Sequence, residues 1–263
     1  MNQILESIIE NKRLEVAQRK SATPVERLES SPFFNRTPIS LKKSLMSEHA
    51  SGIIAEFKRK SPSAGWLKRN ADPVDITRGY VHAGATALSV LTDRNFFAGT
   101  RDDLMRAREV NKCPILRKDF MIDPYQVLEA KAIGADVILL IASVLDNSSI
   151  REMAGQAHDM GLEVLLEIHE SSELAYLNNW IDIVGVNNRN LKKMETDVQT
   201  SIDLAGMIPE QYLKISESGI HDPETIIFLK NLGYRGFLIG EYFMKHAKPE
   251  KSCRKFINKI NTR

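Results

Sequence analysis

The chain has 263 residues, of which 43% are hydrophobic and 27% charged, as in an ordinary globular protein with a large core. A formal charge of +2, from 36 basic and 34 acidic residues, gives no electrostatic case for a nucleic-acid or membrane partner. Residues 1–20 carry Glu6, Glu10 and Glu15, which argues against a signal or transit peptide, and no apolar run is long enough to span a bilayer. Cys113 and Cys253 lack metal-type spacing and favour a reducing compartment, so we expect a cytoplasmic protein.

Residues 1–48 precede the first predicted strand. Ile4, Leu5, Ile8, Ile9 and Leu14 recur at helical spacing, which predicts an amphipathic helix. The sequence leaves two positions open for this helix. It could cover the bottom of a barrel or reach over its mouth.

Eight short apolar runs of strand type follow, at residues 53–58, 87–91, 115–118, 137–141, 163–167, 183–187, 212–216 and 237–239. Amphipathic segments lie between several of them, at 73–82, 101–109, 125–133, 148–160 and 223–232, and some of these end at a glycine, a common helix stop. Repeated strand and helix units predict parallel pairing with right-handed crossovers.

Eight such units in about two hundred residues match a closed barrel better than an open doubly wound sheet. No strand runs into a G-x-G-x-x-G turn, so a dinucleotide-binding sheet has no fingerprint here. We therefore predict an α/β protein in which residues 1–263 form a single (β/α)8 TIM-barrel domain. Residues 1–48 are its N-terminal helical extension.

The end of the first strand is the most informative part of the sequence. Its apolar run leads to Glu56 and Lys58, which share one face because side chains alternate along a strand. The carboxyl ends of barrel strands are where active sites lie. The turn that follows, residues 61–65, offers hydroxyls and backbone amides that can hold an anion.

Four more predicted strands end in polar residues, namely Arg117-Lys118-Asp119, Glu167, Asn187-Asn188-Arg189 and Ser216-Glu217-Ser218-Gly219. A single Lys or Glu at a strand end is most often solvated or part of a weak surface ion pair. Two lysines and two glutamates around one concave site would instead shift one another's pKa values, as acid–base catalysis requires.

Glycine turns follow the last two strands, at Gly219 and at Gly240-Glu241. The loops after these strands form the common phosphate site of such barrels, which predicts a phosphorylated substrate; ordinary turn chemistry is the alternative. The six histidines show no metal-ligand spacing. We therefore interpret each as a structural or surface residue and expect no metal.

Taken together, these segments resemble the indole-3-glycerol phosphate synthases, the ring-closing lyases of tryptophan biosynthesis. The matching residues are 53–58 with 61–63, 91–93 with 96–99, 116–120 with 123–126, 166–169, 185–191, 216–220 and 238–241. The resemblance implies conversion of 1-(2-carboxyphenylamino)-1-deoxyribulose 5-phosphate to indole-3-glycerol phosphate, with loss of carbon dioxide and water. It implies neither a metal nor an organic cofactor.

The resemblance also implies roles for individual residues. Lys118 matches the general acid at the substrate ketone and Glu167 the base in dehydration, while Lys58 matches a second lysine near the substrate carboxylate, for which an acid role in dehydration is the alternative. The residues that orient these groups are Glu56, Asn187, Arg189, Glu217 and Ser218. The phosphate site corresponds to Ser61, Gly219, Gly240 and the backbone of Glu241, and the aromatic-ring pocket to Phe97, Phe120 and Leu191.

Two other functions stay open at this point. One is a class I aldolase-like barrel, in which Lys118 or Lys58 forms a Schiff base with a sugar phosphate. The other is a phosphate-binding barrel that has lost catalysis. It ranks lower because Lys and Glu are present at all the positions proposed for catalysis. We expect a phosphorylated small molecule as the partner, no nucleic acid, no membrane, and a monomer or weak homo-oligomer.

Overall fold

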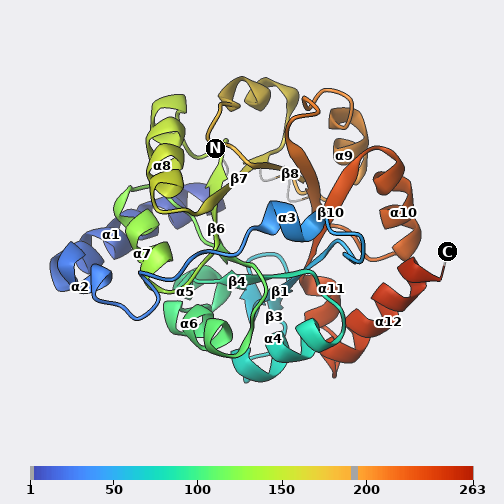
Figure 1. Ribbon diagram of the computed structural model, residues 1–263, viewed down its shortest axis with the longest axis horizontal. Coiled ribbons are helices and arrows are strands. Elements are labelled where there is room, and N and C mark those ends of the chain that lie inside the picture. The colour runs from blue at the N-terminus through green and yellow to red at the C-terminus, as the bar shows by residue number, and fades with distance from the viewer. Residues whose placement is uncertain (1–2, 191–194, 263) are drawn as a thin grey trace.

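The computed structural model describes residues 3–190 and 195–262 and contains a closed barrel of parallel strands (Figure 1). The strands are β1 (Ile53–Phe57), β4 (Ala87–Leu91), β5 (Ile115–Lys118), β6 (Val137–Ile141), β7 (Glu163–Ile168), β8 (Ile183–Asn187), β9 (Leu213–Glu217) and β10 (Tyr234–Ile239). Each strand pairs with the next along the chain, and β10 pairs with β1. The predicted (β/α)8 barrel is confirmed. The largest difference in a strand boundary is at β10, which begins at Tyr234 rather than at 237.

Helices surround the barrel. Five lie where the sequence predicts them, namely α4 (Pro73–His82), α6 (Arg101–Val110), α7 (Tyr125–Ala132), α8 (Asn147–Asp159) and α10 (Pro223–Asn231). The elements that were not predicted are α5 (Arg94–Phe97), η1 (Ser171–Tyr176), α9 (Gln199–Leu204), α11 (Glu241–Met244), α12 (Pro249–Asn261) and the hairpin of β2 (Lys60–Ser61) and β3 (Gly65–Trp66). Most of these are too short to complete a periodic pattern.

Two of the predicted helices begin at the same local signal, an Asp followed by a Pro. The Asp72 carboxylate accepts hydrogen bonds from the backbone of Val74 and Asp75 at the start of α4, and the Asp222 carboxylate accepts one from the Glu224 amide at the start of α10. The proline that follows each Asp has its φ angle already set for the first helical turn. These starts therefore follow from sequence alone.

The strands separate two apolar layers. The larger layer fills the space between strands and helices, and a smaller one fills the barrel interior, including Ile54, Leu116, Leu139, Leu165, Ile215 and Leu238. Because side chains alternate along a strand, the residue two positions after an interior residue also faces inward. Leu116 is followed by Lys118, Leu165 by Glu167 and Ile215 by Glu217, so the core pattern itself directs these charges toward the mouth.

The N-terminal extension reaches both ends of the barrel, and its predicted amphipathic helix takes the position over the mouth. Helix α1 (Gln3–Ala22) lies at the mouth, with α2 (Val25–Glu29) after it, and α3 (Leu41–Leu45) crosses the opposite end, which faces the viewer in Figure 1. Leu41 and Leu45 pack into the interior layer. The Glu163 carboxylate, at the start of β7, accepts hydrogen bonds from the Ser40 hydroxyl and from the first amides of α3.

Asp136 ties the segment before α3 to the barrel. Its side chain is fully buried; Oδ1 accepts from Arg36 at 2.6 Å and from the Ile39 amide at 2.7 Å. Oδ2 accepts from Arg108 and from the Ile115 amide, each at 2.8 Å. One carboxylate thus neutralises a buried guanidinium and joins three segments.

Replacing Asp136 with Asn should lower the free energy of unfolding by about 3–5 kcal/mol, because Arg108 would remain buried without its counter-charge. Urea denaturation followed by circular dichroism measures this. Asp203→Asn, on the exposed face of α9, is the matched control and should change the value by less than about 0.5 kcal/mol. Equal, small effects in both variants would contradict the role given to Asp136.

Candidate active site

A cavity of about 670 Å³ opens at the carboxyl ends of the strands. It is lined by every predicted site residue that the structure describes, and Leu191 lies outside the described residues. These lining residues are Glu56, Lys58, Ser61, Phe97, Lys118, Phe120, Glu167, Asn187, Arg189, Glu217, Ser218, Gly219, Gly240 and Glu241. Residues spread over the whole barrel therefore share one space.

Lys118 lies at the centre of this cavity between two carboxylates. Its Nζ donates to Glu167 Oε2 at 2.7 Å and to Glu217 Oε2 at 2.8 Å. Burial by itself lowers the pKa of an ammonium group, but Glu167, Glu217 and Glu56 outweigh burial and raise the pKa of Lys118 above its ordinary value. The resting site therefore holds a fully charged lysine, which is a proton donor.

The two carboxylates beside Lys118 differ in proton affinity. Burial favours the neutral form of Glu167, yet Lys118 and His169 outweigh it and hold the pKa of Glu167 well below its usual range. Burial, together with the charges of Glu167 and Glu56, raises the pKa of Glu217 to about 7, despite Lys118. One lysine thus lies between an anionic carboxylate and a carboxyl that exchanges a proton near neutral pH.

His169 is a site neighbour that sequence reasoning treated as a structural or surface residue. Its Nε2 lies 3.4 Å from Glu167 Oε1, and its Nδ1 lies 3.7 Å from Glu173 Oε2. Burial lowers the pKa of the imidazole, but these two glutamates outweigh burial and raise the pKa to about 9. The amide of Asn187 also donates to Glu167 Oε1, at 3.0 Å, so two hydrogen bonds, from Lys118 and Asn187, fix this carboxylate and the His169 ring lies beside it. The only sequence signal for His169 was its position just beyond a strand end.

Glu56 and Lys58 form a second acid and base pair on β1 and the loop after it. The two side chains share one face, as predicted, and Lys58 Nζ lies 2.7 Å from Glu56 Oε1. Both side chains are largely buried. Among the described residues that line the cavity, Lys58, Lys118 and Lys245 each lie beside a carboxylate.

On the side of the cavity next to β1, β9 and β10, the lining includes the backbone of small residues that follow β9 and β10. Ser218 and Gly219 both have left-handed backbone, with φ of 68° and 72°, and Asn188 holds the Ser218 carbonyl at 3.0 Å. A non-glycine residue in this conformation costs about 1–3 kcal/mol and is most common at functional sites. A Cβ at Gly240 would clash with the Glu56 carboxylate, so only glycine fits there.

The other side of the cavity is apolar. Phe97 of α5 and Phe120 lie with their ring centroids 6.2 Å apart. Ile4, Leu5 and Ile8 of α1 line the same cavity; the sequence marked them as one face of a helix without placing that helix. The cavity therefore combines an aromatic and aliphatic side, a charged centre and a glycine-rich side, which suits an elongated anion with an aryl end.

Within residues 3–190 and 195–262, no three or more His, Cys, Asp and Glu side chains gather in a way that could hold a metal ion. Across the same residues, no helix combines the length and the apolar character needed to cross a membrane.

Comparison with known proteins identifies the family. A family model described as indole-3-glycerol phosphate synthase matches residues 5–256. A Bacteroides thetaiotaomicron protein of that name is 50% identical over 262 residues, which cover 99% of this chain and 100% of the relative. The chain belongs to the indole-3-glycerol phosphate synthase family. This is a family of lyases in tryptophan biosynthesis, and the resemblance found in the sequence is confirmed.

Further indole-3-glycerol phosphate synthases match almost as completely. The Bordetella pertussis and Burkholderia vietnamiensis proteins are 42% and 41% identical, and each match covers 95% of this chain and 97% of the relative.

Solved structures with the same fold include 3-hexulose-6-phosphate synthase from Salmonella typhimurium, with a TM-score of 0.63, 13% identity and 80% of this chain and 99% of that chain covered. A mutant tryptophan synthase α-subunit from Pyrococcus furiosus has a TM-score of 0.62 and 13% identity, over 82% of this chain and 99% of that chain. At this identity the likeness supports the barrel fold alone.

The raised pKa of His169 makes stability depend on pH. The pKa of His169 is about 9 in the folded state and 6.5 in the unfolded chain. Its protonation therefore stabilises the fold fully at pH values below 6.5. That contribution is lost as the pH rises through 9. Between about pH 6 and pH 9.5, the stability difference between the wild type and His169→Gln should shrink by at most about 3 kcal/mol.

Urea denaturation at a series of pH values measures this difference. His82→Gln removes an exposed imidazole on α4 and is the control, and its difference from the wild type should stay constant over the same range. A constant difference for His169→Gln as well would contradict the charged imidazole.

Proposed function

We propose that this chain converts 1-(2-carboxyphenylamino)-1-deoxyribulose 5-phosphate to indole-3-glycerol phosphate, releasing carbon dioxide and water. The observation that carries the assignment of roles is Lys118 held between Glu167 and Glu217 at the centre of the cavity. The aryl ring of the substrate lies against Phe97 and Phe120, and the phosphate lies at the glycine turns. The family membership supports the reaction, and the geometry supports the residues that carry it out.

The phosphate is held mainly by backbone on the glycine-rich side. Gly219 and Gly240 let an anion approach amide groups, and Ser61, which is buried at the end of β2, adds a hydroxyl. Glu241 contributes its backbone, because its carboxylate is already paired with Lys245 at 2.5 Å and lies 3.6 Å from Arg189. These two cations keep the carboxylate from repelling the phosphate.

In the first step Lys118 acts as general acid. The ring carbon that carries the carboxylate attacks the ketone carbon, and the carbonyl oxygen takes a proton from Lys118 as the carbon–carbon bond forms. Lys58 holds the substrate carboxylate until it leaves as carbon dioxide, and the electrons of that bond restore the aromatic ring. Glu217 lies 2.8 Å from Lys118 and carries a proton near neutral pH, so it is placed to recharge the lysine.

In the second step water is lost. The hydroxyl created at the former ketone carbon leaves with a proton from Lys118, or from Lys58 in the alternative assignment, while Glu167 removes a proton from the neighbouring carbon that bears the nitrogen. With Lys118 recharged by Glu217, its proton passes to the leaving hydroxyl in this step, and Glu167 then loses a paired charge and becomes a stronger base. The donation thus assists the proton removal that follows it. Glu56, Asn187, Arg189 and Ser218 orient these groups.

We also propose that residues 1–263 act as one domain with residues 1–48 as its extension. A monomer or a weak homo-oligomer is part of the proposal, because residues of one chain line the charged, apolar and glycine-rich sides of the cavity. Cys113 and Cys253 are both free thiols, which supports a cytoplasmic enzyme.

Lys118→Met and Glu167→Gln should each lower kcat by about 10²–10⁴-fold, because each removes a group that moves a proton. The appearance of indole fluorescence on mixing with the substrate measures kcat. Both variants should keep a cooperative thermal transition and bind inorganic phosphate as the wild type does. Near-normal turnover in both would remove the assigned roles.

Borohydride separates this proposal from an aldolase-like reaction. An acid lysine leaves the substrate free, so treatment with sodium borohydride during turnover should give no covalent adduct. A Schiff base at Lys118 or Lys58 would be reduced to a stable amine. Intact-protein mass spectrometry detects the added mass, and its appearance would favour the aldolase.

The phosphate position is tested by two matched changes at Gly219. Asp and Asn both tolerate its left-handed backbone, and both bring a Cβ within 2.5 Å of Thr196 Cγ2, so they differ mainly in charge. We expect KM to be at least about tenfold higher for Gly219→Asp than for Gly219→Asn, because the carboxylate repels the phosphate. Equal KM values would place the phosphate elsewhere.

A further inference from the structure

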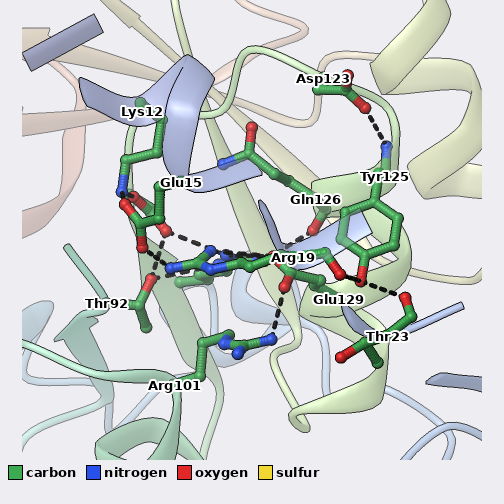
Figure 2. A network of polar contacts seen from close by, with 12 residues as sticks. Lys12, Glu15, Arg19, Thr23, Thr92, Arg101, Asp123, Tyr125, Gln126 and Glu129 are labelled. Atoms are coloured by element: carbon green, nitrogen blue, oxygen red, sulfur yellow. Dashed lines mark hydrogen bonds and ion pairs between the residues drawn. The ribbon is translucent and has the colours of Figure 1, made fainter. Parts of the chain in front are cut away.

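Helix α1 is attached to the cavity by a buried ammonium group. The Lys12 side chain is fully buried, with its Nζ 2.9 Å from Asp93 Oδ2, 2.8 Å from Asp119 Oδ1 and 2.8 Å from Glu15 Oε2. Glu15 belongs to the same helix, whereas Asp93 and Asp119 follow β4 and β5. Figure 2 labels Lys12 and Glu15 of α1 together with Thr92, which directly precedes Asp93 and donates its hydroxyl to Asp119 at 2.7 Å. One charge thus joins α1 to two loops of the barrel mouth.

The two aspartates that bind Lys12 also position the aromatic side of the cavity. Asp93 caps α5 by accepting from the Phe96 amide at 2.9 Å, and α5 carries Phe97. Asp119 Oδ1 accepts from the Phe120 amide at 2.9 Å. The same carboxylates therefore bind Lys12 and fix the segments that present both rings.

Helix α1 contributes a third apolar element to this side. Leu5 and Ile8 line the cavity seven and four residues before Lys12, which is the spacing of one helix face. Where Lys12 is held therefore decides how far these aliphatic side chains project over the mouth.

Among the described residues, only one of the three carboxylates depends on Lys12 alone. Asp119 also forms an ion pair with Arg117 at 3.0 Å, and Glu15 forms one with Arg19. Figure 2 shows the adjoining network, in which Arg19 and Arg101 reach Glu129. Within the described part of the chain, Asp93 has no cation other than Lys12 at ion-pair distance. Removing Lys12 would leave a fully buried Asp93 without a counter-charge.

We propose that Lys12 is a positioning residue for the aryl end of the substrate. By pairing with Asp93 and Asp119, it holds α1, Phe97 and Phe120 together as the walls of one aryl pocket. Lys12 itself is buried behind these groups and acts through them. The inference rests on the proposed function in taking an anthranilate-type ring as the ligand of this pocket.

The test compares binding of two substrate fragments, anthranilate and inorganic phosphate, by isothermal titration calorimetry. The variants are Lys12→Met and the double variant Lys12→Met with Asp93→Asn. The second change removes the unpaired charge and keeps the oxygen that caps α5, so the double variant folds even where the single one does not. Thermal unfolding checks both proteins.

In the double variant, the Kd for anthranilate should rise at least about tenfold, while the Kd for phosphate stays as in the wild type. With the full substrate, KM should rise by a similar factor and kcat should change by less than about threefold, because the proton-moving groups are untouched. General damage to the fold would instead weaken phosphate binding and lower kcat as well.

Lys20→Met is the matched control. Lys20 lies on the same helix and pairs with Asp123, in the loop after β5, at 2.7 Å, but it is 48% exposed. This variant should bind both fragments and turn over substrate as the wild type does. The same loss of anthranilate binding in Lys20→Met would overturn the proposal, because any loosening of α1 would then suffice.

Unchanged anthranilate binding and KM in the double variant would also overturn it. The fragment measurements need no turnover, so they test the role of Lys12 even if the wild-type protein forms no indole product. Absence of indole product would refute the proposed function without deciding the role of Lys12.

Discussion

The cavity depends on one buried ammonium group that two carboxylates share. Lys118, Glu167 and Glu217 come from β5, β7 and β9, and 49 and 99 residues separate the lysine from its two partners. Burying three ionisable groups costs free energy that only close pairing offsets, so these strands must be held in fixed register. A closed barrel provides that register, because each strand is paired on both sides.

The same arrangement gives the site its chemistry. A single lysine lies between a carboxylate that stays anionic and a carboxyl that titrates near pH 7. Because the pKa of each group depends on the charge of the others, moving one proton changes the affinity of the neighbours for theirs. The proposed acid and base roles are therefore properties of the cluster, and His169, which lies beside Glu167 and Glu173, is part of it.

Buried charges also attach the N-terminal extension at both ends of the barrel. Asp136 and Glu163 hold the segment around α3 at the amino ends of the strands, and Lys12 holds α1 at the carboxyl ends. Apolar contacts alone would let a helix slide, since they have little directionality, whereas these hydrogen-bonded pairs fix a position. The extension thus closes the bottom of the barrel and completes the wall of the cavity above.

The sequence by itself determined the barrel, its strand order along the chain and the polar residues that line the mouth. Local rules sufficed for these, because strands alternate in period two and Lys118, Glu167 and Glu217 each follow an interior residue by two positions. Tertiary structure alone decided that α1 lies at the mouth, that Lys12 pairs with Asp93 and Asp119, and that His169 lies against Glu167. Those contacts depend on how the barrel closes and on a helix packing against loops far away in the chain. No period in the sequence encodes them.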